Sequence, residues 1–177
     1  KHCEHITALA LTMFDSWKPI HGLGPSWRRL LRTAAMLHDI GITINYYSHA
    51  RHSAYMIENA RLFGLTHKEQ VIAAAIAGWH NGVSRSYLRN KAYKYFLSDS
   101  DLTKISQLAL LLALAESMDY SQTMKISEII PEIRSKKTAS LTLKADSLPS
   151  IELHQLKQHL PWFGKVFNME LVIETCN

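Results

Sequence analysis

The chain has 177 residues, which suggests one medium domain or one domain with a small appendage. It is 47% hydrophobic and 20% charged, as expected for an ordinary soluble globular protein. The longest apolar run, Leu108 to Ala115, falls far short of the roughly 20 residues that a membrane-spanning helix needs. We therefore expect no membrane partner.

The two cysteines, Cys3 and Cys176, lack metal-ligand spacing and are too few for a disulfide framework. No signal peptide opens the sequence, so we expect a cytoplasmic protein. The formal charge is +5, and basic residues cluster at Arg28, Arg29 and Arg32 and again at Arg85, Arg89, Lys91 and Lys94. These clusters form either solvated helix faces or an attraction for polyanions. Because no nucleic-acid-binding module accompanies them, phosphate-bearing small molecules or polyphosphate are favoured over DNA.

Apolar spacing predicts helices over most of the first 124 residues. The expected helices cover residues 2–17, 26–38, 49–60, 66–80, 86–96 and 102–118, with the ends at His38 and His80 and the start at Leu102 approximate. Ser26 and Thr66 are expected to cap the second and fourth of these helices, and Asp99 or Asp101 the last. Thr66 and Glu69 have the spacing of a capping box. The stretch from Asp39 to Ser48 is expected to be a non-helical connection.

The pattern changes after residue 124. "KTASLTLKA" alternates polar and apolar residues as a half-buried strand does, and "PSIEL" and "MELVIET" are similar. Between the last two lies an amphipathic segment interrupted by Pro161. We therefore predict a helical domain over residues 1–124 and a small strand–strand–helix–strand unit over residues 125–177.

An imidazole and a carboxylate stand side by side where an apolar helix ends, at His38 and Asp39. Both groups are costly to bury unless something binds them, and Gly41 allows the helix to loosen there. Other candidate metal ligands lie at helix ends or inside apolar helices. In chain order, the full set is His2, His38, Asp39, His52, His80 and Glu116. Nitrogen and carboxylate ligands of this kind suit Mn, Fe, Zn or Mg.

Each of these residues also has a structural explanation by itself. His80 at a helix C-terminus interacts favourably with the helix dipole. His5 and His49 are expected at the surface or behind the ligands, and Glu116 could pair with an arginine. The joint pattern, with each group at a different helix edge, favours a metal site.

The pattern resembles the HD superfamily of metal-dependent phosphohydrolases. More narrowly, the stretch from "AAMLHDIG" through "RHSAYMI" to "IAGWH", together with "LALLLALAESMDYSQ", resembles the helical region of the exopolyphosphatase / guanosine pentaphosphate phosphatase family. "IELHQLKQHLPWFGKVFNMELVI" resembles the final small unit of that family. The resemblance implies a mostly α fold, an HD-type bundle of about six helices followed by a small C-terminal α+β unit.

The resemblance implies one or two divalent ions and catalytic roles for His38 and Asp39. A first ion would be held by His2, His38, Asp39 and Glu116, and Asp39 would bridge to a second ion held by His52 and His80. Arg51, Arg85 and Arg89 are expected to bind phosphate. The implied substrates are polyphosphate, a guanosine polyphosphate or another nucleotide, and a homodimer is also implied.

The sequence departs from the family pattern in three ways. The N-terminal two-lobed phosphatase domain is absent, so the chain is either a fragment or a stand-alone descendant. Glu116 stands where an Asp is usual, and Asp119 could substitute for it as ligand. Asn81-Gly82 replaces a basic pair. Three functions are therefore open: a metal-dependent phosphohydrolase, a non-catalytic polyphosphate-binding and dimerisation module, or a purely structural helical domain.

Overall fold

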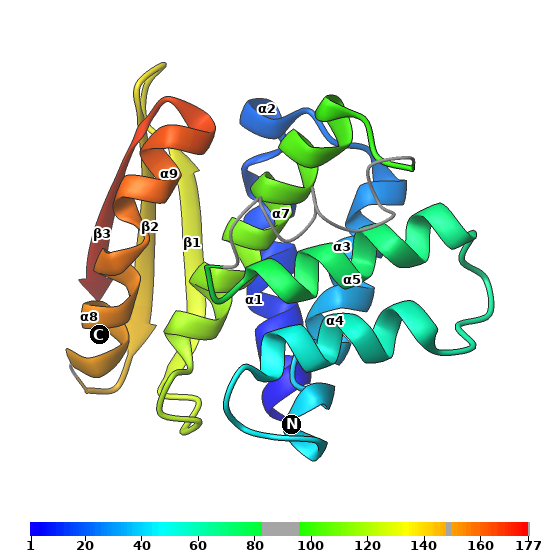
Figure 1. The fold of residues 1–177 in the computed structure, drawn as a ribbon. Coiled ribbons are helices and arrows are strands. Elements are labelled where there is room, and N and C mark those ends of the chain that lie inside the picture. The colour runs from blue at the N-terminus through cyan, green and yellow to red at the C-terminus, as the bar shows by residue number, and fades with distance from the viewer. Residues whose placement is uncertain (83–95, 148–149, 177) are drawn as a thin grey trace.

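Helix α7, Asp99–Met118, runs through the middle of a helical bundle in the computed structural model (Figure 1). The structure describes residues 1–82, 96–147 and 150–176. Around α7 lie α1 (His2–Ser16), α3 (Pro25–Leu37) and α5 (His67–Trp79). Nearly every residue of α7 from Ile105 to Met118 is buried, because a helix that is apolar all round has no face to offer to water.

The remaining helices of the bundle are short or peripheral. Helix α2 (Lys18–His21) follows α1, the 3₁₀ helix η1 (Ile40–Thr43) follows α3, and α4 (His49–Asn59) packs on α5 and η1. The expected non-helical connection after Asp39 therefore contains one 3₁₀ turn. The helix expected at residues 86–96 lies almost wholly outside the described residues. Among those that are described, no helix has the length and apolar character needed to cross a bilayer.

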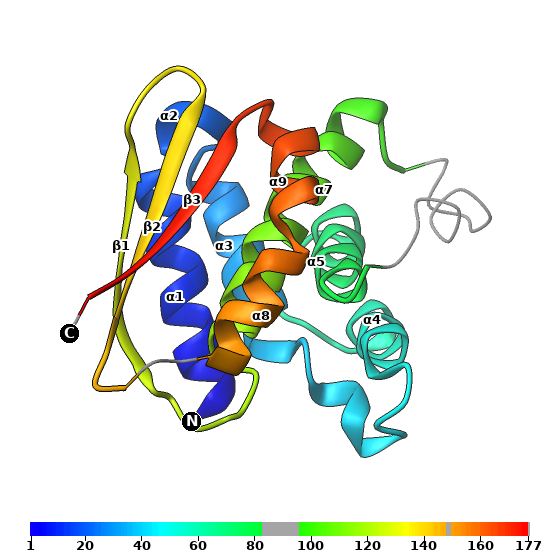
Figure 2. The same cartoon turned by 90° about the vertical axis from the view of Figure 1, so that its left-hand side faces the viewer.

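A three-stranded sheet and two helices complete the chain. The strands are β1 (Ile126–Ile133), β2 (Thr138–Ala145) and β3 (Glu170–Cys176), and the helices are α8 (Ser150–Gln158) and α9 (Leu160–Phe167). Strand β2 lies in the centre, antiparallel to β1 and parallel to β3. Figure 2 shows the sheet in front of α1, with α8 and α9 beside the sheet; these two helices pack on α7. The mostly α fold with a small C-terminal α+β unit is thus confirmed.

One prediction for this last unit is wrong, and one strand was missed. Residues 151–153, expected in a strand, lie in α8, where Glu152 in the first turn favours the helix N-terminus. Strand β1 was not predicted, because Pro131 interrupts its sequence pattern. The strand is at the edge of the sheet, where a residue without an N–H is tolerated.

The predicted caps had mixed outcomes. The capping box of Thr66 and Glu69 is confirmed. Helix α3 begins one residue before Ser26, with Gly24 as its N-cap, because a proline at the first helical position suits that start. The N-cap of α7 is Ser98, and Asp101 is the reciprocal partner in its capping box.

Gly41 controls the approach of η1 to α4. A Cβ placed on it would lie 2.3 Å from the carbonyl oxygen of His49 and 2.4 Å from the backbone nitrogen of Ser53. Its own N–H donates to the Ser53 hydroxyl at 2.8 Å. The glycine is therefore required by a close backbone approach immediately after Asp39.

We predict that Gly41→Ala lowers the free energy of unfolding by about 1–3 kcal/mol, since backbone atoms must move to admit the methyl group. Denaturant unfolding measures the change. The control is Gly164→Ala in α9, where the added Cβ meets only the Met169 carbonyl oxygen at 3.7 Å. This control should be neutral or stabilising by up to about 1 kcal/mol. Equal effects of the two substitutions would contradict the role given to Gly41.

Candidate metal centre

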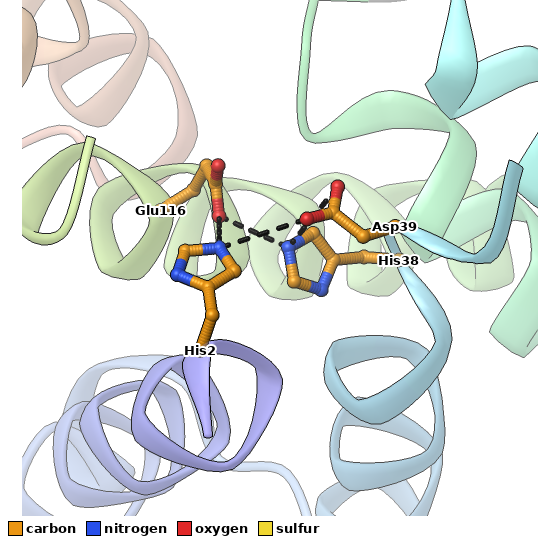
Figure 3. A group of neighbouring side chains, drawn as sticks. All are labelled: His2, His38, Asp39 and Glu116. Atoms are coloured by element: carbon orange, nitrogen blue, oxygen red, sulfur yellow. Dashed lines mark hydrogen bonds and ion pairs between the residues drawn. The ribbon is translucent and has the colours of Figure 1, made fainter. Parts of the chain in front are cut away.

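Four side chains from different parts of the sequence converge at one end of the bundle (Figure 3). His2 opens α1, His38 and Asp39 follow the last turn of α3, and Glu116 lies in the last turn of α7. One ligand atom from each of these four residues lies within 4.8 Å of all the others. The four residues that were expected to hold a first ion therefore lie close together in the structure.

The backbone at the end of α3 lets two adjacent side chains share this space. His38 keeps helical angles, whereas Asp39 has φ −101° and ψ 0°, in the sparsely populated bridge region where many active-site residues lie. Because the backbone leaves the helical path at Asp39, the Asp39 side chain faces His2, while the His38 ring stays against the last turn of α3. Two residues after Asp39, the close contact of Gly41 with α4 holds the backbone in place.

The Glu116 carboxylate is the group that the two histidines share. Its Oε2 atom lies 3.2 Å from Nε2 of His2 and 3.0 Å from Nε2 of His38. Asp39 lies slightly farther away, with one oxygen 3.6 Å from Nε2 of His2 and the other 3.6 Å from Nε2 of His38. Both Nε2 atoms therefore face two carboxylates at once.

The opposite nitrogen of each ring is already committed elsewhere. Nδ1–H of His2 donates to the buried Asp119 carboxylate at 2.8 Å, and Nδ1–H of His38 donates to the Ala35 carbonyl at 2.7 Å. These bonds orient each ring and leave Nε2 for the shared space, as is usual for metal-binding histidines.

The carboxylates of Glu116 and Asp39 stabilise positive charge on the facing imidazole nitrogens of His2 and His38. The hydrogen bond with Glu116 raises the pKa of His2 to about 9, although burial opposes this. Burial also acts to lower the pKa of His38, but the bond and charge of Glu116 outweigh it and raise the pKa. For Glu116, burial alone would raise the pKa, but the bonds from both histidines hold it well below its usual value. Protons on the imidazoles supply this charge, and a metal cation in their place supplies it equally.

Two further histidines lie beside the centre. Nε2 of His49 is 3.4 Å from an oxygen of Asp39, and its Nδ1–H donates to the Tyr46 carbonyl at 3.1 Å. The ring of His80 packs 5.2 Å from that of His38 and 5.6 Å from that of His49. Nδ1–H of His80 donates to the Ala77 carbonyl, and its buried Nε2 has no hydrogen-bond partner among the residues that the structure describes.

The other predicted site residues are placed differently. His52 is half-buried, and its Cβ lies against Gly41 rather than in the convergent group. Arg51 is exposed on the first turn of α4. Arg85 and Arg89 lie outside the described residues, so their expected phosphate contacts stay predictions, as does that of Arg51.

Sequence reasoning missed the roles of two residues. His49 lies behind the ligands, which is one of the two places expected for it, but its specific contact with Asp39 was not predicted; it opens α4 directly after the left-handed Ser48. Asp119 was considered a substitute ligand, whereas the structure places it behind His2, with its other oxygen accepting from the backbone N–H of Met124 at 2.6 Å. The signal available for Asp119 was its spacing, three residues after Glu116, at the helix end.

Comparison with known proteins identifies the family. Residues 1–159, which include all four converging side chains, match the family model described as Ppx/GppA phosphatase, domain III. The chain belongs to this family. The wider resemblance to the HD superfamily stays a prediction.

Curated relatives of this Ppx/GppA domain include proteins named guanosine-5'-triphosphate,3'-diphosphate pyrophosphatase. The one from Pseudoalteromonas translucida is 27% identical over 167 residues, covering 90% of this chain and 29% of the relative. The one from Aeromonas salmonicida is 32% identical over 77 residues, 43% of this chain and 16% of the relative. The chain thus spans less than a third of the length of these relatives.

The buried His80 makes a testable contribution to the pH dependence of stability. Burial lowers the pKa of His80 to about 4, and the charge of His38 acts in the same direction. The unfolded chain takes up this proton near pH 6.5, so the contribution is complete above that pH and is lost as the pH falls toward 4. Between pH 7.5 and 5 the loss should be about 2 kcal/mol.

The measurement is denaturant unfolding of metal-free protein at both pH values, compared with His80→Asn. The asparagine amide can still donate to the Ala77 carbonyl but does not titrate, so the variant should show a pH dependence weaker by about 2 kcal/mol. His154→Asn, at an exposed position on α8, is the control and should leave the pH dependence unchanged. A His80→Asn variant with the wild-type pH dependence would contradict the assignment.

Proposed function

We propose that this chain is a metal-dependent phosphohydrolase domain of the Ppx/GppA family, with an HD-type centre on His2, His38, Asp39 and Glu116. The observation that carries the proposal is the convergence of their ligand atoms within 4.8 Å, with both imidazole Nδ1 groups already bonded elsewhere. Two nitrogens and two carboxylates form a donor set that suits Mn, Fe, Zn or Mg. The residues present therefore fit a divalent ion.

A divalent cation bound here would supply charge for phosphate oxygens and make a nearby water more acidic. The protein groups do the positioning. Asp119 and the Ala35 carbonyl hold the rings of His2 and His38, and Asp39 presents its second oxygen toward His49. Arg51, which lies in the first turn of α4 together with His49, is proposed to orient phosphate groups. The proposed substrates are phosphate anhydrides or esters of polyphosphate or a nucleotide.

The proposal is for one ion in the first instance. Within the described ranges, one group of potential ligand atoms converges in this way, and it includes neither His52 nor His80. A bridging second ion on those two residues therefore has less support than the first ion. His49, whose Nε2 lies 3.4 Å from Asp39 and whose ring packs against that of His80, is better placed than His52 to assist the centre.

A second candidate function is a non-catalytic module that binds polyphosphate within a larger phosphatase. It is favoured by one observation, that the relatives named as pyrophosphatases are more than three times as long as the matched segment. In this case metal and phosphate would bind without turnover. The two functions differ in one measurable quantity, the release of phosphate by the metal-loaded chain.

We predict about one metal ion per chain after loading with Mn or Fe(II), measured by plasma mass spectrometry. In His38→Ala and Glu116→Ala, bound metal should fall below about a tenth of this value, since each removes a ligand and leaves a charge unpaired. His154→Ala is the matched control, because His154 is exposed on α8 and should leave metal content unchanged. Absence of metal from the loaded wild type would contradict the proposal.

The same preparations decide between enzyme and module. Phosphate release from tripolyphosphate or from guanosine 5'-triphosphate,3'-diphosphate by the wild type, lost in His38→Ala and retained in His154→Ala, supports the enzyme. Metal-dependent binding of these compounds without release supports the module.

Asp119→Asn tests the positioning of His2. An asparagine whose carbonyl oxygen keeps the bond from the Met124 N–H turns its NH₂ group toward Nδ1 of His2. Nδ1 must then accept, so the proton moves to Nε2 and blocks that nitrogen as a ligand. Metal affinity should fall about 10–100-fold, measured by calorimetric titration with Mn. Asp99→Asn, at an exposed position of the first turn of α7, is the control, and an affinity loss of equal size there would refute the role of Asp119.

A further inference from the structure

Exposed apolar side chains are concentrated in the stretch of sequence that contains His38 and Asp39. Half of the large apolar residues that are exposed in the described parts of the chain lie between residues 36 and 55. They are Met36, Ile40, Ile42, Ile44, Tyr46, Tyr47 and Tyr55. Apolar surface gathered in one short segment is unfavourable in water, and such patches commonly mark binding sites.

Two tyrosines at the tip of this segment are held outward by the backbone. Tyr46 is 68% exposed and Tyr47 80% exposed, and their rings meet edge to face at 5.9 Å. The side chain of Asn45 accepts from the N–H of Tyr47 at 2.9 Å, and Ser48 adopts a left-handed conformation with φ 60°. A non-glycine residue in that conformation is strained, which is typical of ligand-binding turns. The turn therefore presents the two rings to solvent instead of burying them.

This pair is connected directly to the metal centre. The Tyr46 ring lies 6.1 Å from the ring of His49, and the Tyr46 carbonyl accepts the Nδ1–H of His49. On its other side, Nε2 of His49 is 3.4 Å from the Asp39 carboxylate. One imidazole ring thus separates the exposed tyrosines from a proposed metal ligand.

We infer that Tyr46 and Tyr47 form a stacking platform for the base of a nucleotide whose phosphates lie at the Asp39 end of the bundle. The inference rests on the proposed function and narrows its substrate class. Every nucleobase has a planar face that stacks on an aromatic ring, and the tyrosine hydroxyl remains free to meet polar base edges or sugar. Inorganic polyphosphate has no planar group and gains nothing from exposed aromatic rings.

The test compares guanosine 5'-triphosphate with inorganic tripolyphosphate, which carries the same number of phosphates without a base. Affinities for the Mn-loaded protein are measured by calorimetry. Tyr46→Ala and Tyr47→Ala should each weaken nucleotide binding about 5- to 100-fold, the loss expected for one stacking contact. Tripolyphosphate binding should be unchanged, and Tyr46→Phe and Tyr47→Phe should retain most of the nucleotide affinity.

Phe63→Ala is the matched control, since this residue is 94% exposed but lies beyond the other end of α4. Equal affinity of the wild type for both compounds, or nucleotide binding that both alanine variants leave unchanged, would overturn the platform. A chain whose mass in solution is dimeric and becomes monomeric in Tyr46→Ala, with no change in nucleotide binding, would assign the patch to a second copy and also overturn it.

The platform can fail separately from the proposed function. If neither metal nor tripolyphosphate binds, guanosine 5'-monophosphate is titrated against protein labelled with 3-fluorotyrosine, and the signals of Tyr46 and Tyr47 are assigned through the phenylalanine variants. Saturable shifts of these two signals keep the platform while the metal proposal falls. Absence of such shifts overturns the platform as well.

Discussion

The half-buried carboxylate of Glu116 is the charge around which the candidate centre is arranged. It lies near the end of α7, the helix that the rest of the bundle encloses, and a carboxylate in such a place is unfavourable without a partner. His2 and His38 supply that partner from α1 and α3. The ends of three helices must therefore meet at one level, which couples the packing of the bundle to the geometry of the centre (Figure 3).

Helix termini also prepare the histidines chemically. His38 and His80 each follow the last residue of a helix, and each donates its Nδ1–H to a carbonyl three residues earlier. Such carbonyls have no partner within the helix, so the bond satisfies the backbone and fixes the ring in one step. The Nε2 atoms are then directed inward. For His38 that direction leads to Glu116, and for His80 it leaves a buried nitrogen without a partner in the described parts of the chain.

Much of the fold was predictable, because local patterns decided it. The stripe of Ile6, Leu9 and Met13 on α1 and the apolar length of α7 both follow from helix periodicity, and all of these residues are buried. The predictions failed where contacts with neighbouring elements determine the secondary structure. Pro131 hid β1 because only its place at the sheet edge permits it, and residues 151–153 have a pattern that fits either a strand or the first turn of a helix.

The sequence by itself determined that His2, His38, Asp39 and Glu116 were costly polar groups on apolar helices or at their ends, because burial follows from periodicity. Only the tertiary structure decided which atoms meet. His49 reaches Asp39 and His52 does not, since a left-handed Ser48 and the close approach at Gly41 rotate α4 in a way that spacing alone does not reveal. Asp119 accepts a hydrogen bond from Nδ1 of His2, on the side of the ring away from the centre. Its other oxygen accepts from the N–H of Met124, because the chain turns after the end of α7. Contacts between residues 117 positions apart depend on how helices pack, and no local pattern encodes that distance.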